Sequence, residues 1–87
     1  MTALHTREYR VFARALIAAR EAAGLSQYDL ADRLGVDQSF ISKYEHCRRR
    51  LDVIEFLRIL QAIGANAPQF VDRLEADLTL LSPPPDN

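Results

Sequence analysis

The apolar residues of this chain recur at every third or fourth position, in segments that are short and clearly ended. Gly24, Gly35 and Gly64, the three glycines of the chain, each follow directly on such a segment, and glycine is the residue that most often ends a helix. Steps of three and four match the turn of an α-helix and not the alternation of a strand. The chain has only 87 residues, rich in Ala, Leu, Arg and Glu, so the sequence predicts one compact all-α domain, residues 1–81.

Capping residues indicate where three of the five expected helices begin. Ser26 with Asp29, and Asp52 with Glu55, form capping-box patterns, in which each side chain bonds the backbone N–H of the other. Asp37 is expected to cap the helix that follows Gly35. The expected helices cover residues 7–23, 27–34, 38–46, 53–63 and 68–81.

Packing expectations follow from the same pattern. Val36 and Ile41 are expected to fill the angle between the second and third helices. Pro68 suits the first position of the last helix, and "SPPPDN", residues 82–87, is expected to be a disordered tail. The fourth helix is expected to bury Val53, Phe56, Leu57, Leu60 and Ile63.

Charge is distributed unevenly along the chain. Residues 1–50 hold nine Lys and Arg against six Asp and Glu, whereas residues 51–87 hold two against six. A polyanion is therefore expected to bind the first part of the chain. The sequence shows no signal or membrane-spanning pattern, and its single cysteine permits no intramolecular disulfide, so a cytoplasmic location is expected.

No residues have the spacing of a catalytic or metal site. His46 and Cys47 lack further suitably spaced ligands, and the sequence has neither a nucleophile–base set nor a glycine-rich phosphate loop. We therefore expect no enzyme, metal or cofactor. Redox sensing by Cys47 is a minor alternative, since nearby arginines favour the thiolate but no resolving cysteine is present.

Two short expected helices joined by the turn "GVD" match the helix-turn-helix arrangement, residues 27–46, in which the second helix is held in position to enter the DNA major groove. Glutamine can pair with adenine, serine can donate or accept, and lysine can reach guanine or a phosphate. We expect base readout on one face of the second helix, with an ordinary solvated face as the alternative. That face carries Gln38, Ser39, Ser42 and Lys43.

Several motifs at fixed spacing resemble one family. "R-x-x-x-G-L-S-Q", "L-A-x-x-L-G-V", "Q-S-x-I-S-K-x-E" and "L-x-x-I-L-x-A-I-G" all lie within residues 16–64. Together they resemble the Cro and phage-repressor type of helix-turn-helix domain, the XRE family. The resemblance implies a five-helix, lambda-repressor-like fold that binds double-stranded DNA, usually as a dimer on a near-palindromic operator.

The resemblance also implies roles for single residues. Gln27 matches a glutamine that bonds a DNA phosphate and braces the first residue of the recognition helix, here Gln38. Tyr28 is assigned to the DNA backbone as well. Arg20 and Glu45 match a structural pair that links the first helix to the recognition helix.

The loop after the recognition helix contains Arg48, Arg49 and Arg50. They are expected to contact phosphates, and each contact steepens the salt dependence by about 0.9 in log–log slope. A solvated charge run that stabilises the preceding helix end is a compatible alternative.

Cys47 stands where this family commonly has glycine. A glycine there adopts positive φ at little cost, and cysteine is not expected to, so the loop should leave the helix differently. Tyr44 is expected in the core, with its hydroxyl at the rim.

An apolar stripe continues to the end of the last expected helix. We assign it to homodimerisation, while folding back onto the first helix is an alternative that does not exclude a dimer. The stripe consists of Phe70, Leu74, Leu78 and Leu81.

The sequence thus favours a dimeric, sequence-specific transcription repressor. The alternative is an antitoxin that autoregulates its operon and binds a basic toxin through its acidic C-terminal part.

Overall fold

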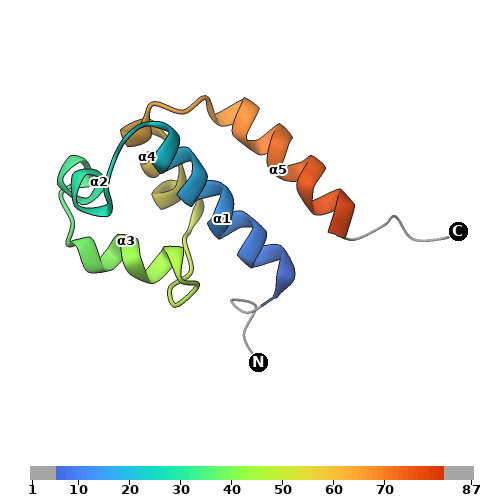
Figure 1. Cartoon of the computed structure of the whole chain (residues 1–87), viewed down its shortest axis with the longest axis horizontal. Helices are drawn as coiled ribbons and strands as arrows, with labels where there is room; N and C mark the ends of the chain where they lie inside the picture. Colours follow the sequence, from blue (N-terminus) through green and yellow to red (C-terminus); the bar gives the residue numbers. More distant parts are fainter. Residues whose placement is uncertain (1–5, 82–87) are drawn as a thin grey trace, which may run out of the picture.

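The computed structural model describes residues 6–81, which form five α-helices joined by short loops (Figure 1). Each helix begins and ends within one residue of its expected bounds, so the predicted all-α class is confirmed. The tail expected at residues 82–87 lies outside the described part. Among the helices described, none is long and apolar enough to cross a membrane. The helices are α1 (Arg7–Ala22), α2 (Gln27–Leu34), α3 (Gln38–Glu45), α4 (Val53–Ile63) and α5 (Ala67–Leu81).

Side-chain hydrogen bonds cap the starts of several helices. Ser26 Oγ accepts the Asp29 N–H at 3.0 Å, and Asp52 Oδ1 accepts the Glu55 N–H at 2.7 Å. Both acidic partners return the bond, so the two predicted capping boxes are confirmed. Asn66 caps α5 through its side-chain oxygen. Local sequence therefore sets these helix ends.

Two expectations about helix starts are wrong. Asp37 occupies the position before α3, but its side chain makes no capping hydrogen bond. Its backbone carbonyl accepts the Phe40 N–H instead, at 3.0 Å. Pro68 is the second residue of α5 and not the first, because the helix already begins at Ala67.

The core lies where α1, α2, α3 and α4 meet. Each of these helices contributes at least one side chain with almost no exposed surface, and half-buried residues of α5 pack against their edge. The largest fully buried side chains are Leu16, Leu30, Ile41, Tyr44, Ile59 and Leu60.

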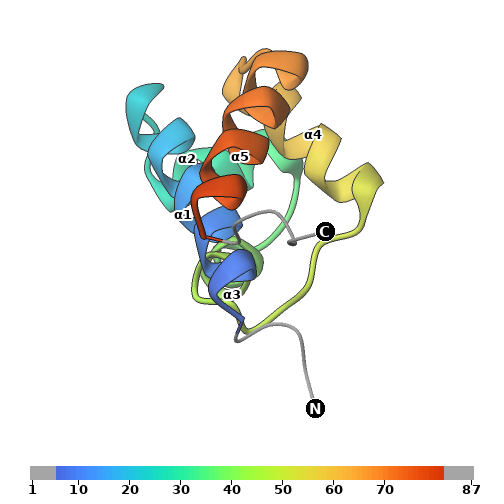
Figure 2. The same cartoon turned by 90° about the vertical axis from the view of Figure 1, so that its right-hand side faces the viewer.

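The fully buried residues of α4 all lie in its second half, and Phe56 packs against the core from the first half. Val53 and Leu57 are 67% and 42% exposed, although the apolar period placed them on the buried face, and Ile59 is buried. The first turn of α4 lies at the edge of the molecule (Figure 2). Val36 is also exposed, so of the two residues expected between α2 and α3 only Ile41 is buried.

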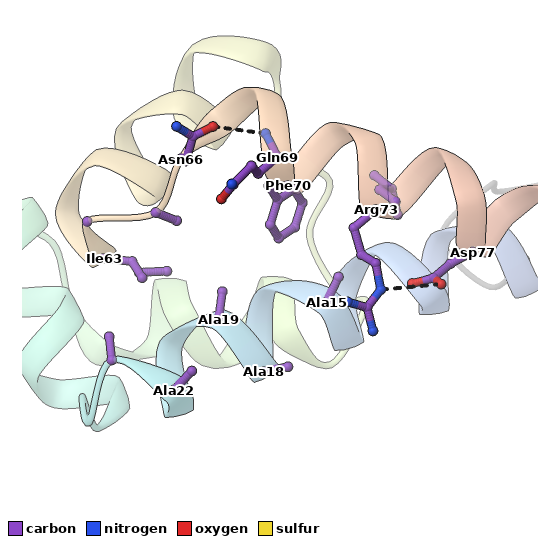
Figure 3. A pocket seen from close by; sticks show the side chains of 14 residues that line it. Ala15, Ala18, Ala19, Ala22, Ile63, Asn66, Gln69, Phe70, Arg73 and Asp77 are labelled. Atoms are coloured by element: carbon purple, nitrogen blue, oxygen red, sulfur yellow. Dashed lines mark hydrogen bonds and ion pairs between the residues drawn. The ribbon is translucent and has the colours of Figure 1, made fainter.

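Helix α5 runs antiparallel to α1 and contacts it (Figure 1). Phe70 points from α5 toward α1, and its ring centroid lies 5.5 Å from that of Phe56 (Figure 3). None of residues 67–81 is fully buried. A groove of about 810 Å³ remains between the two helices, because the facing positions of α1 carry small side chains. These are Ala15, Ala18, Ala19 and Ala22, and Ala23 follows directly after α1.

Candidate nucleic-acid interface

A buried ion pair joins α1 to the C-terminal end of α3. Arg20 Nε donates to Glu45 Oε2 at 2.8 Å, and Nη2 donates to Oε1 at 3.1 Å. The two side chains are 10% and 3% exposed, and Arg20 also donates to the Leu25 carbonyl at 2.8 Å. The hydrogen bond to Glu45 raises the pKa of the Arg20 guanidinium. The structure therefore brings together the two residues of the expected pair.

Gln27 extends this pair to the first residue of α3. Its Nε2 donates to Glu45 Oε1 at 2.8 Å, and its Oε1 accepts from Gln38 Nε2 at 2.7 Å. The result is a relay of side chains from Arg20 through Glu45 and Gln27 to Gln38. The expected brace between the two glutamines is present in the free protein.

The relay has a fixed polarity. A carboxylate only accepts, so Glu45 requires the NH₂ of Gln27 on its side, which turns the Gln27 oxygen toward Gln38. Gln38 must then present its own NH₂ to Gln27. One Nε2–H and the Oε1 of Gln38 remain for other partners, and adenine requires that combination of donor and acceptor.

The other polar residues of α3 lie on the accessible side of the helix. Ser39 and Lys43 are exposed, and Ser42 is half-buried. The Ser42 hydroxyl lies 3.4 Å from His46 Nδ1, which is 2.8 Å from the Ser42 carbonyl. The face expected to read bases is therefore open, and Gln38 is its most constrained member.

Cys47 adopts the conformation that the sequence argues against. Its φ is 59°, the only positive φ of a non-glycine residue within 6–81. The Cys47 N–H bonds the Tyr44 carbonyl, and the Arg48 N–H bonds the Lys43 carbonyl at 2.7 Å, which is the Schellman pattern. The expectation of a different exit from α3 is wrong. The side chain of Cys47 is buried, and this packing offsets a backbone cost of about 1–2 kcal/mol.

Tyr44 is in the core as expected, but its hydroxyl is not at the rim. The residue is 1% exposed, and the hydroxyl finds no hydrogen-bond partner within residues 6–81. Burial raises the pKa of the Tyr44 phenol. The ring packs edge-on to Phe40, with centroids 5.7 Å apart.

The three loop arginines have different environments. Arg48 and Arg50 are exposed, and neither guanidinium forms an ion pair in the described part of the chain. Arg49 is half-buried and forms two hydrogen bonds to Glu55, at 2.7 and 3.0 Å. Its Cζ also lies 4.6 Å from the centroid of the Phe40 ring. A phosphate contact by Arg49 stays a prediction from sequence.

Sequence reasoning missed two contacts that hold this loop. Glu55 was identified only as a capping residue, yet it also binds Arg49, six positions earlier. The Tyr9 hydroxyl accepts the Leu51 N–H at 3.0 Å, across 42 positions of sequence. The charge pattern could have suggested the first contact, but no local signal indicates the second.

The helix-turn-helix family model HTH_3 matches residues 16–70, which include the relay and the arginine loop. The chain belongs to the XRE type of this helix-turn-helix family. The lambda-repressor-like fold is thereby shown, and the protein is a DNA-binding transcription regulator and not an enzyme. No curated protein sequence matches this chain significantly.

Solved structures are similar to this chain over most of its length. An XRE-family like protein from Pseudomonas syringae pv. tomato str. DC3000 is 46% identical, with a TM-score of 0.77 over 83% of this chain and 88% of that one. The restriction-modification controller protein C.AhdI from Aeromonas hydrophila is 26% identical, with a TM-score of 0.68 over 75% and 98%.

A second controller protein, C.Esp1396I, has been solved as a tetramer in complex with its natural 35-base-pair operator. It is 21% identical to this chain, with a TM-score of 0.75 over 83% of this chain and 95% of that one. At this identity the likeness shows the fold alone.

Proposed function

We propose that this XRE-type chain is a cytoplasmic, sequence-specific repressor that binds a near-palindromic operator as a homodimer. The relay that ends on Gln38 carries the proposal, because it fixes a base-reading amide before DNA arrives. The operator complex of C.Esp1396I supports a role of this kind for the fold.

Base readout in this proposal belongs to the open face of α3. Gln38 pairs with adenine, Ser39 and Ser42 contact base edges, and Lys43 reaches a guanine or a phosphate. Backbone phosphates are assigned to residues that surround this face on α2 and in the loop after α3. They are Gln27, Tyr28, Arg48 and Arg50, of which Tyr28 is 67% exposed.

The dimer is proposed from the incomplete cover of α5. Leu74 lines the groove beside α1, and Leu81 lines a smaller hollow at the other end of α5. The stripe Phe70, Leu74, Leu78 and Leu81 is half-buried within one protomer, and a second protomer would cover the part that remains exposed. To read an operator with two half-sites, such a dimer has to hold its two recognition helices about 34–36 Å apart.

Base readout is tested by finding the sites that the tagged protein occupies in its genome, then measuring binding to the best site. Gln38→Ala should lower discrimination at one base pair of each half-site by about 1–3 kcal/mol. Arg48→Ala is the control, since it should weaken all sequences alike and lower the salt slope by about 0.9. A folded protein that shifts no enriched site would refute DNA recognition.

The interface is tested by sedimentation of two matched variants. Leu78→Asp should give a folded monomer, because a carboxylate cannot be buried in the apolar stripe. Leu57→Asp changes an exposed leucine of α4 and should leave the dimer intact. A monomer from Leu57→Asp and an intact dimer from Leu78→Asp would instead place the interface on α4. A second small protein that co-purifies with the chain would favour the antitoxin function.

A further inference from the structure

The loop between α3 and α4 is held by three helices. Cys47 closes the end of α3, the Tyr9 hydroxyl of α1 accepts the Leu51 N–H, and Glu55 of α4 binds Arg49. Ordering a flexible loop on binding costs conformational entropy and lowers affinity, whereas a loop that is already ordered avoids this cost. The loop is therefore held in one conformation, and its three arginines can have different roles.

We propose that Arg49 is a positioning residue that aims Arg48 and Arg50 at the DNA backbone and makes no phosphate contact itself. This inference rests on the proposed function. It divides three consecutive arginines, which the sequence presents as equivalent, into two that bind and one that holds.

The hydrogen bonds of Arg49 support this division. Both N–H groups of Nη1 are used, one by Glu55 Oε1 at 3.0 Å and the other by the Arg50 carbonyl at 3.1 Å. Nη2 donates to Glu55 Oε2 at 2.7 Å. A bidentate pair of this kind fixes the plane of the guanidinium, so Arg49 is constrained in orientation as well as position.

Phe40 provides the second constraint. Its ring lies on α3 and faces the Arg49 guanidinium at 4.6 Å from the centroid, a cation–π distance. Arg49 thus connects the recognition helix, through Phe40, with the first turn of α4, through Glu55. Glu55 is itself fixed, because it accepts the Asp52 N–H at 3.0 Å.

Charge supports the same assignment. Arg49 and Glu55 form an ion pair without net charge, whereas Arg48 and Arg50 carry positive charges that are not paired within residues 6–81. Phosphate binding gains affinity by releasing counterions, and a neutral pair releases few. The Arg49 hydrogen bond lowers the pKa of the Glu55 carboxyl, so the pair is ionised at neutral pH.

The decisive variant is Glu55→Gln, because the two roles of Arg49 predict opposite signs. If Arg49 contacts phosphate, the substitution releases a cation and removes an acidic charge, so DNA binding tightens. If Arg49 positions the loop, binding weakens by about threefold to tenfold, the cost of ordering one or two side chains on binding. Glutamine can still accept the Asp52 N–H, so the cap of α4 is retained.

The experiment measures the affinity of the full chain for its operator at several salt concentrations. We expect Arg49→Ala and Glu55→Gln to weaken binding by similar factors, to be non-additive in the double variant, and to keep the wild-type salt slope. Arg48→Ala and Arg50→Ala should each lower the slope by about 0.9. Asp72→Asn removes an exposed acidic charge from α5 and should not weaken binding.

Arg49→Lys keeps the proposal testable if the alanine variant does not fold. Lysine retains the charge but not the planar fork, so it should bind as weakly as alanine if Arg49 positions the loop. A drop of about 0.9 in slope for Arg49→Ala, or tighter binding by Glu55→Gln, would overturn the inference. Wild-type protein that binds no DNA would instead refute the proposed function, on which the inference depends.

Discussion

Two arginine–glutamate pairs with the same chemistry occupy different environments in this protein. Arg20 and Glu45 join α1 to α3 with side chains that are 10% and 3% exposed, whereas Arg49 and Glu55 join the loop to α4 at 39% and 27%. Both pairs are bidentate. Burial therefore decides what each pair contributes, because water competes with the second pair and not with the first.

The same kind of ion pair can therefore stabilise the fold when it is buried, or fix the conformation of a loop when it is half-exposed. An uncompensated charge in the core is costly, so removing one member of the buried pair should destabilise the fold strongly. The half-exposed pair contributes little to stability, but it fixes the direction of a loop next to the recognition helix. We expect substitutions in the first pair to affect folding, and those in the second to affect binding.

The largest effect is expected for Glu45→Ala. It leaves the Arg20 guanidinium buried without its partner and should lower the free energy of unfolding by about 3–5 kcal/mol, measured by urea denaturation. DNA binding should fall as well, because Gln27 loses the acceptor that orients it.

The double variant Arg20→Met, Glu45→Met separates these two losses. Replacing both charges with apolar side chains of similar volume should restore much of the stability. It should not restore sequence-specific binding, because the relay to Gln38 remains broken. Recovery of both properties together would show that the pair does not organise the recognition helix.

A smaller effect is expected for the half-exposed pair. Glu55→Gln should lower the free energy of unfolding by less than about 1 kcal/mol at neutral pH. The folded pKa of Glu55 is lowered by Arg49, so this contribution is fully present above the ordinary carboxyl pKa and is lost as pH falls through the folded pKa. Urea denaturation of the wild type and the variant at pH 7 and pH 3 measures this dependence.

The free energies of unfolding of the wild type and of Glu55→Gln should therefore converge as the pH falls. Asp29 keeps some acid sensitivity in both, because its hydrogen bonds with the Ser26 backbone and hydroxyl also lower its pKa. A difference between wild type and variant that does not shrink at low pH would show that the Arg49–Glu55 ion pair is not its source.

Much of the fold was predictable because it depends on local chemistry. The two capping boxes, the glycine stops at Gly35 and Gly64, and the apolar period set the helix bounds within short windows of sequence. Val53 and Leu57 were placed incorrectly because periodicity gives the apolar face of a helix but not how far its neighbours extend along it.

Parts of the candidate site were predictable for another reason. Gln27, Gln38, Arg20 and Glu45 came from the match of several motifs to a family, and the structure places them in one connected relay. Arg49 could not be distinguished from Arg48 and Arg50 in this way, because three consecutive arginines do not show which side chain turns toward the protein and which turn toward solvent. Only the positions of Phe40 and Glu55 distinguish it.

The sequence by itself determined the helices, their order and the residue types on the recognition face, since these follow from hydrogen bonds and periodicity within a few residues. Tertiary structure alone decided that Cys47 adopts a positive φ, that the Tyr44 hydroxyl is buried and that Arg49 faces Glu55. Each of these depends on contacts between separate elements, whose combined packing outweighs the local preference of a single residue.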